Sequence, residues 1–253
     1  MPKGQELYSS KKERKMNSVN NTSRVLGVAF LLQAITSLTS GLILKLALIV
    51  PGNTSASMIN IANNAWLMRA NILGEMFTAL GIIFLGAILF VTLRKQNEKI
   101  ALVALGFYIL EAVLLAVSRM AAFSLLHISQ EYATVGQPAY LQTIGNLAFE
   151  SMNFGYTLLM LSFCPGGILF YYLLYKSGVV PRALSLWGII TVFPMLVGTL
   201  TQIFGYPIPF IFYLPYVPFE FVIGVWILVR GVKDSSERAT TLQGLREASA
   251  HLR

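Results

Sequence analysis

Charge and reactive side chains are scarce in this 253-residue sequence, and each scarcity excludes a class of protein. Only 12% of the residues are charged, about half of the roughly 25% typical of a soluble domain. A single cysteine, Cys164, rules out an intramolecular disulfide framework. The two histidines, His127 and His251, are too few for a His/Cys/Asp cluster with zinc or haem spacing. The sequence therefore predicts no metal and no cofactor.

Catalytic and nucleotide-binding motifs are also missing. No GxSxG, HExxH, P-loop or Rossmann glycine pattern is present. The chain offers no recognisable nucleophile, which disfavours an enzyme. The net charge of +8 comes from Lys and Arg residues that flank apolar segments. That distribution is typical of anchors on an anionic lipid leaflet, and it argues against nucleic acid as a partner.

Long apolar runs are what the sequence has in abundance: 55% of the residues are hydrophobic, and the mean hydropathy is +0.65. Runs of about 20 residues suit helices that cross a hydrocarbon core of roughly 30 Å. A β-barrel would show alternating segments of about ten residues instead. We therefore predict an all-α, polytopic membrane bundle with the lipid bilayer as its main partner. Its six transmembrane helices are expected at roughly 25–50, 67–93, 100–125, 151–175, 183–204 and 209–230.

Lys and Arg alternate between the predicted loops. They occur in the leader, in the loops at 94–99 and 176–182, and in the tail, whereas 51–66, 126–150 and 205–208 contain none. The positive-inside rule then places both termini in the cytoplasm of a cell with the protein in its plasma membrane. The expected organisation is a basic, disordered leader (1–23), a transmembrane domain (24–231) and a cytoplasmic tail (232–253).

Two outer loops carry apolar residues at near-helical spacing, namely "SMINIANNAW" (57–66) and "YLQTIGNLAFE" (140–150). We interpret them as short interfacial helices on the outer face. They could equally be the first turns of the spans that follow.

Seven ionisable residues fall within or beside the predicted spans, and a charge at mid-membrane costs about 2.5–3.5 kcal/mol or more. These groups must pair, face a wet cavity or lose their charge. Nothing charged lies in the inner half, so we expect a polar cavity in the outer half of the membrane. The candidate ligand-binding or intramembrane polar cluster comprises Glu111, Glu220, Arg119, Glu75, Lys45, Asn71, Glu150, Asn153, Tyr213 and Tyr216.

Side-chain direction suggests how the charges pair. Helical side chains lean toward their own N-terminus, which aims Arg119 and Glu220 at similar depths. We hypothesise that Glu220 pairs with Arg119 or with another inward-leaning cation, and a structural pair between Arg119 and Glu75 is the alternative. With four carboxylates and three cations near the membrane, at least one acid lacks a partner.

The predicted fourth span contains "FCPGGILF", in which Pro165, Gly166 and Gly167 fall near mid-membrane. A break here would expose backbone groups to a substrate. A plain proline kink packed against a neighbouring helix is the alternative.

Several short stretches resemble a bacterial membrane family catalogued as domain of unknown function 4386. They are "SRVLG" with Gly27, "LEA" with Glu111, "VPRALSLWG" with Trp187 and Gly188, and "FE" followed by "IGVWILVRG" with Phe219, Glu220 and Gly224. The resemblance covers roughly residues 22–233. It implies a compact multi-pass bundle in a bacterial plasma membrane, and it implies no activity.

Three functions are open at this stage. A non-enzymatic binding or transport protein, with a small-molecule or lipid ligand in the charge-lined cavity, fits the converging charges. A structural or partner-binding membrane subunit would use the same charges as internal ion pairs. A membrane-embedded enzyme would use a carboxylate as acid or base on a lipid or periplasmic small molecule. A partner protein or homo-oligomer is not specified by the sequence.

Overall fold

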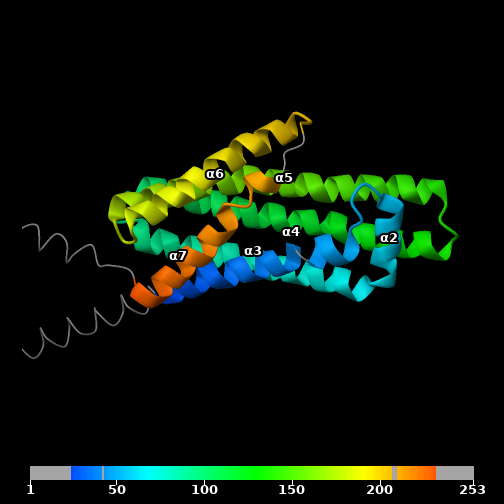
Figure 1. The fold of residues 1–253 in the computed structure, drawn as a ribbon, viewed down its shortest axis with the longest axis horizontal. Coiled ribbons are helices and arrows are strands. Elements are labelled where there is room, and N and C mark those ends of the chain that lie inside the picture. The colour runs from blue at the N-terminus through cyan, green and yellow to red at the C-terminus, as the bar shows by residue number, and fades with distance from the viewer. Residues whose placement is uncertain (1–23, 42, 207–209, 232–253) are drawn as a thin grey trace, which may run out of the picture.

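A computed structural model describes residues 24–41, 43–206 and 210–231 of the chain (Figure 1). Over these ranges the regular structure is helical throughout, and no strand occurs among them. The predicted leader and tail domains lie outside the described residues. The all-α membrane class is thus confirmed for the part of the chain that can be described.

Five helices within this part are long and apolar enough to cross a membrane. The sixth predicted span is shorter: it comprises a 3-10 turn, η2, and α7, whose 15 residues extend about 22 Å. A helix of that length does not cross a hydrocarbon core of about 30 Å unaided. In chain order the elements are the first span Arg24–Leu48 (with the π-helical η1, Ile43–Leu48), α2 (Thr54–Asn63), α3 (Ala65–Leu93), α4 (Glu98–Thr134), α5 (Ala139–Ser177), α6 (Arg182–Ile203), η2 (Phe210–Phe212) and α7 (Tyr216–Arg230).

Polar caps and glycines set several of the helix ends. The side chains of Asn53 and Asn97 accept hydrogen bonds from Ala56 N at 2.9 Å and Ile100 N at 3.2 Å, which caps α2 and α4. Gly178 ends α5 at φ 61°, a left-handed conformation that favours glycine. The apolar spans therefore begin and end where the sequence turns polar or flexible.

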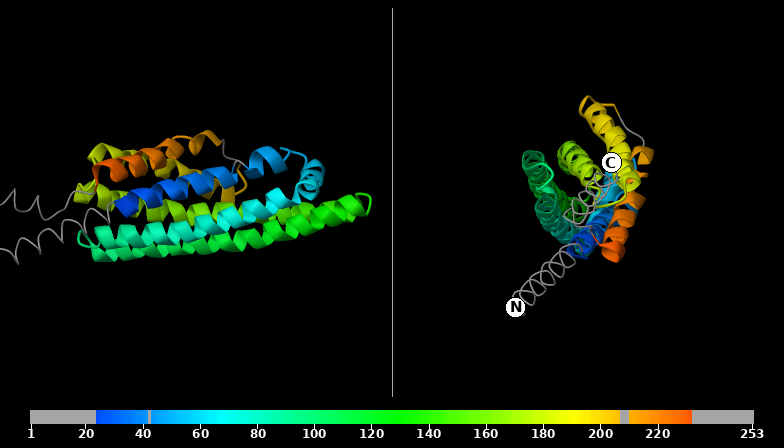
Figure 2. Two further views of the ribbon diagram at one scale, coloured as in Figure 1. Left: turned by 90° about the horizontal axis from the view of Figure 1, so that it is seen from below. Right: turned by 90° about the vertical axis from the view of Figure 1, so that its left-hand side faces the viewer.

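The long helices pack antiparallel, with both described chain ends at one end of the bundle (Figures 1 and 2). We call this the basic end, because the residues at the helix termini there include Arg24, Arg94, Lys95, Lys99, Lys176, Arg182 and Arg230. The opposite end carries α2 and the turn between α4 and α5, and we call it the hairpin end.

Two helices extend well beyond a membrane thickness at the hairpin end. The 37 residues of α4 and 39 residues of α5 span about 55 and 58 Å. There α2 packs on the pair through a second apolar core that includes Met58, Ile61 and Leu126. The stretch 57–66 therefore lies largely in a separate short helix as predicted, whereas 140–150 forms the first turns of α5, which was the alternative.

The predicted helix break at Pro165, Gly166 and Gly167 does not occur, because α5 is helical throughout this segment. A proline removes one backbone hydrogen bond, and the remaining ladder holds the helix together. The glycines serve packing: a β-carbon placed at Gly166 would lie 2.9 Å from Cβ of Phe107 and 3.0 Å from Cδ2 of Tyr108. The segment thus brings α5 close to α4 and exposes no backbone.

Glycine also joins the first span to α7. A β-carbon at Gly27 would come within 2.6 Å of the backbone nitrogen of Leu228, and one at Gly224 within 2.9 Å of the Leu31 side chain. Such close approach is possible only without a side chain, and it places the short α7 firmly in the bundle.

We expect Gly27→Leu to destabilise the protein by about 1–3 kcal/mol or more, because the new side chain overpacks the contact with α7. Gly106→Leu is the matched control, since a β-carbon at Gly106 meets open space. Thermal unfolding in detergent checks this, at about 2–4 °C per kcal/mol for a chain of this length. Equal melting temperatures for the two variants would contradict the packing described.

Candidate functional site

A buried glutamate, a partly buried one and three tyrosines gather where α4, α5 and α7 meet, and we call this group the acid layer. Glu111 is 6% exposed, and Glu220 lies close enough to interact with it electrostatically. The Tyr171 and Tyr216 hydroxyls are 2.7 Å apart, and Tyr216 donates to Glu220 Oε1 at 3.0 Å. Tyr108 lies within electrostatic range of both acids. The layer therefore places two carboxylates within electrostatic range of each other among aromatic side chains.

Aromatic packing holds the acid layer in place. Phe219 makes edge contacts with Tyr171 and Trp187 at centroid distances of 5.0 and 5.9 Å. It also fills the space over Gly188, where a β-carbon would lie 2.6 Å from Cζ of the phenylalanine ring. Because Glu220 follows Phe219 in α7, this packing fixes the position of the carboxylate.

A second polar group, the arginine layer, lies nearer the hairpin end between α3, α4 and α5. Tyr156 donates to Glu75 Oε1 at 2.6 Å, and the guanidinium of Arg119 lies 4.9 Å from the centroid of the Tyr156 ring. Arg119 also donates to Ser118 Oγ at 3.2 and 3.0 Å. Both charged side chains are only 3% exposed. A tyrosine thus mediates between a buried cation and a buried anion.

Several buried polar atoms around these layers have no hydrogen-bond partner. Asn71 donates to the Ser40 carbonyl at 2.8 Å, but its Oδ1 is unpartnered. The same holds for Gln33 Oε1, Glu111 Oε2 and one terminal nitrogen of Arg119. Buried polar atoms without partners are uncommon in folded proteins, and each one calls for an explanation.

The hypothesised pairing of Arg119 with Glu220 is wrong. Glu111 and Arg119 lie eight residues apart on α4, about 12 Å along its axis, and Arg119 interacts with Glu75 instead. No ion pair forms within the described part of the chain around Glu220, whose hydrogen bond comes from Tyr216. The Lys45 side chain lies outside the described residues, so its proposed role is untested.

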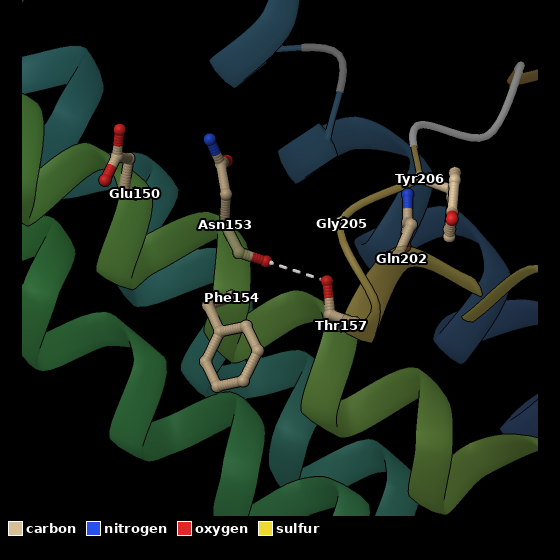
Figure 3. A pocket seen from close by; sticks show the side chains of 7 residues that line it. All are labelled: Glu150, Asn153, Phe154, Thr157, Gln202, Gly205 and Tyr206. Carbon is tan, nitrogen blue, oxygen red and sulfur yellow. Dashed lines mark hydrogen bonds between the residues drawn. The ribbon is translucent and has the colours of Figure 1, made fainter. Parts of the chain in front are cut away.

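An open hollow lies between the middle part of α5 and the C-terminal end of α6 (Figure 3). The exposed side chains of Glu150 and Asn153 line it from α5, opposite Gln202 and Tyr206. Figure 3 shows Thr157 one turn below, donating to the Asn153 carbonyl at 3.4 Å. The predicted site residues Glu150 and Asn153 thus line a surface hollow and do not join the buried layers. The hollow is lined by Glu150, Asn153, Phe154, Thr157, Gln202, Gly205 and Tyr206.

Tyr213 was predicted to belong to the polar cluster with Tyr216 and Glu220, but it precedes α7 and donates to Gln202 Oε1 at 3.5 Å. Sequence reasoning missed Tyr108, Tyr156 and Tyr171. A signal exists for Tyr108, which stands three residues before Glu111 and thus on the same helix face. Tyr156 and Tyr171 carry no local signal that separates them from other apolar-span tyrosines.

Comparison with protein families gives one result. The family described as "Domain of unknown function (DUF4386)" matches residues 25–231. The chain belongs to this family. Neither the curated proteins nor the solved structures gave a match. Membership confirms the resemblance predicted from short sequence stretches, and it fits a membrane protein.

The stretches that carry the resemblance meet around α7. Gly27 of the first span contacts Leu228, and Gly188 of α6 contacts Phe219. Glu111 of the second stretch lies within electrostatic range of Glu220 in the fourth. Within this DUF4386 protein, the short stretches therefore mark the docking of α7 and the acid layer that it completes.

Among the described residues, no three His, Cys, Asp or Glu side chains come together as a metal-binding group. The carboxylates occur as the pair in the acid layer and as the separate Glu75 in the arginine layer.

We expect Tyr156→Phe to cost about 1–3 kcal/mol of stability, because it removes the hydrogen bond to the buried Glu75 carboxylate. Tyr172→Phe on the same helix is the control, since Tyr172 is 43% exposed. Thermal unfolding of both variants in lipid nanodiscs checks this. A Tyr156→Phe protein as stable as wild type would show that Tyr156 does not support Glu75.

Proposed function

We propose that this membrane protein is a non-enzymatic binding or transport protein with its binding site at the acid layer. One observation carries the proposal: Glu111 is buried with an unpartnered Oε2, it lies within electrostatic range of the partly buried Glu220, and the described residues supply no cation to either of them. Two carboxylates in such a position repel each other. A group that weakens the fold is retained when function requires it.

The hollow supports entry of the ligand from the surface between α5 and the end of α6. Its α5 residues, Asn153 and Thr157, flank Tyr156 of the arginine layer in sequence. Cys164, which lies within electrostatic range of Glu111, is eight residues further along α5, about 12 Å toward the basic end. The hollow and the arginine layer therefore lie at one level of α5, and the acid layer lies further toward the basic end of the same helix. This order fits a charge-lined cavity in the outer half of the membrane.

The proposed topology has six membrane-embedded segments, α7 included, with both termini in the cytoplasm of a bacterium and the protein in its plasma membrane. Support comes from the Lys and Arg residues that cluster at the basic end, because such residues are retained on the cytoplasmic side. The hairpin end then faces outward.

A structural or partner-binding subunit is the second candidate, and the arginine layer favours it. Arg119, Tyr156 and Glu75 join three helices through a hydrogen bond and a cation–π contact. Such an arrangement is expected if the charges of Arg119 and Glu75 serve only to hold the helices together.

Neutralising one acid at a time separates the two candidates. We expect Glu75→Gln to cost about 3–5 kcal/mol, because it leaves Arg119 buried without a counter-charge. For Glu111→Gln and Glu220→Gln we expect unchanged or raised stability, because each removes a repulsion. The matched control on α4 is Glu131→Gln, at an exposed position. The measurement is the melting temperature in nanodiscs, where the Glu75 effect is at least about 6 °C.

A different pattern would refute the binding site. If Glu111→Gln and Glu220→Gln lost as much stability as Glu75→Gln, the acids would be structural and the second candidate would stand.

A further inference from the structure

The hollow between α5 and α6 lies at the depth where a membrane changes from hydrocarbon to lipid headgroups. On α5, Thr157 lies about 20 residues from Lys176 of the basic end, which is roughly 30 Å of helix. On α6, Gln202 lies about 20 residues from Arg182 of the same end. A hydrocarbon core is also about 30 Å thick. With the basic residues at one boundary of the core, both helices therefore place the hollow at the other boundary.

One carboxylate supplies the charge of the hollow. Glu150 lines it, and no Lys, Arg or His is among the lining residues. In the part of the chain that the structure describes, the side chains of Glu150 and Asn153 make no hydrogen bond or ion pair. Gln202 accepts from Tyr213 through Oε1, which leaves its amide nitrogen as a donor. Figure 3 shows the ends of the Glu150, Asn153 and Gln202 side chains pointing toward the same side. The hollow thus offers one anionic acceptor and two amide donors.

An exposed apolar stripe on α6 leads from the membrane interior to the hollow. Its residues are spaced by three or four positions, so they share one helix face. The last of them, Phe204, is 77% exposed and directly precedes Gly205 of the hollow. A stripe of this kind suits contact with lipid acyl chains. It consists of Leu186, Ile190, Phe193, Val197, Leu200 and Phe204.

We propose that the hollow binds one phospholipid whose headgroup ends in an ammonium group, as in phosphatidylethanolamine. The ammonium pairs with Glu150, the amide nitrogens of Asn153 and Gln202 donate to the phosphate oxygens, and the acyl chains lie along the α6 stripe. Charge decides the class of lipid. An anionic headgroup, such as that of phosphatidylglycerol, is repelled by Glu150 and meets no basic side chain in the lining.

The order of the polar groups along α5 matches such a headgroup. Asn153 lies about 6 Å and Glu150 about 10 Å beyond Thr157, away from the basic end. In an aminophospholipid the phosphate likewise follows the glycerol, and the ammonium is outermost. The exposed ring of Tyr206 adds an aromatic face for the ammonium. This site goes beyond the proposed function and uses no residue of the acid layer.

Native mass spectrometry of the full-length protein, freed of lipid in detergent, tests the proposal. Palmitoyl-oleoyl phosphatidylethanolamine and phosphatidylglycerol are added together at equal concentrations, because their masses separate the two complexes. We expect one phosphatidylethanolamine per chain. Its complex should be about fivefold more abundant than that of phosphatidylglycerol, which is the effect of a favourable exposed ion pair.

Variants assign the preference to the hollow. Glu150→Gln should bring the two complexes to similar abundance, and Glu150→Lys should favour phosphatidylglycerol. Both variants should fold, because Glu150 is exposed. Glu131→Gln is the matched control: Glu131 is an exposed glutamate of α4 outside the hollow, and this variant should keep the wild-type preference. Glu111→Gln and Glu220→Gln should keep it too, so that this outcome is independent of the proposed function.

Three results would overturn the lipid site: equal abundance of the two complexes in the wild type, a preference that survives in both Glu150 variants, or a preference that Glu131→Gln removes as well. A fourth is competition by glycerophosphoethanolamine, which has no acyl chains, as effective as that by the lipid. The hollow would then hold a soluble amine. The stability of Glu111→Gln and Glu220→Gln, which tests the proposed function, is unaffected by any of these results.

Discussion

A charge in the interior of a lipid-embedded bundle has to be stabilised by other side chains, and in this protein tyrosine hydroxyls provide much of that stabilisation. Tyr156 donates to Glu75, and Tyr171 and Tyr216 form a relay that ends on Glu220. A tyrosine suits this role because its ring packs as an apolar group while its hydroxyl donates. The two polar layers differ in whether a cation also lies near the buried acid. Around Glu75 a cation balances the acid, whereas around Glu111 nothing described does.

The acid layer depends on α7, a helix of only 15 residues. Phe219 and Gly224 are used for contact with α5, α6 and the first span, and Glu220 lies between them in sequence. Because the same short segment supplies both the docking surface and one of the two acids, small shifts of α7 alter the distance between the carboxylates directly. Binding at the pair and the position of α7 are therefore linked.

Hydropathy and the positive-inside pattern were enough to predict the helical class, the long spans and the intramembrane acids. The length of α7 could not be predicted in this way. The apolar run begins before Pro215, but the helix begins only after this proline, at Tyr216. The pairing of Arg119 was also mispredicted. Depth alone aligned it with Glu220, but rotation about the helix axis decides the partner, and only packing fixes that rotation. Pro165 failed as a break signal because α5 stays helical through it and Gly166 next to it packs closely against α4.

The contact of Gly27 with Leu228 also has a consequence for the order of assembly in the cell. Roughly 200 residues separate these partners, and a ribosome adds about 5–20 residues per second. The first helix therefore waits on the order of 10–40 s for its neighbour. Glu111 on α4 is made partway through that time, roughly 110 residues before Glu220. The acid layer is thus completed late, and the growing chain carries Glu111 for on the order of 5–20 s before Tyr216 and Glu220 have been made.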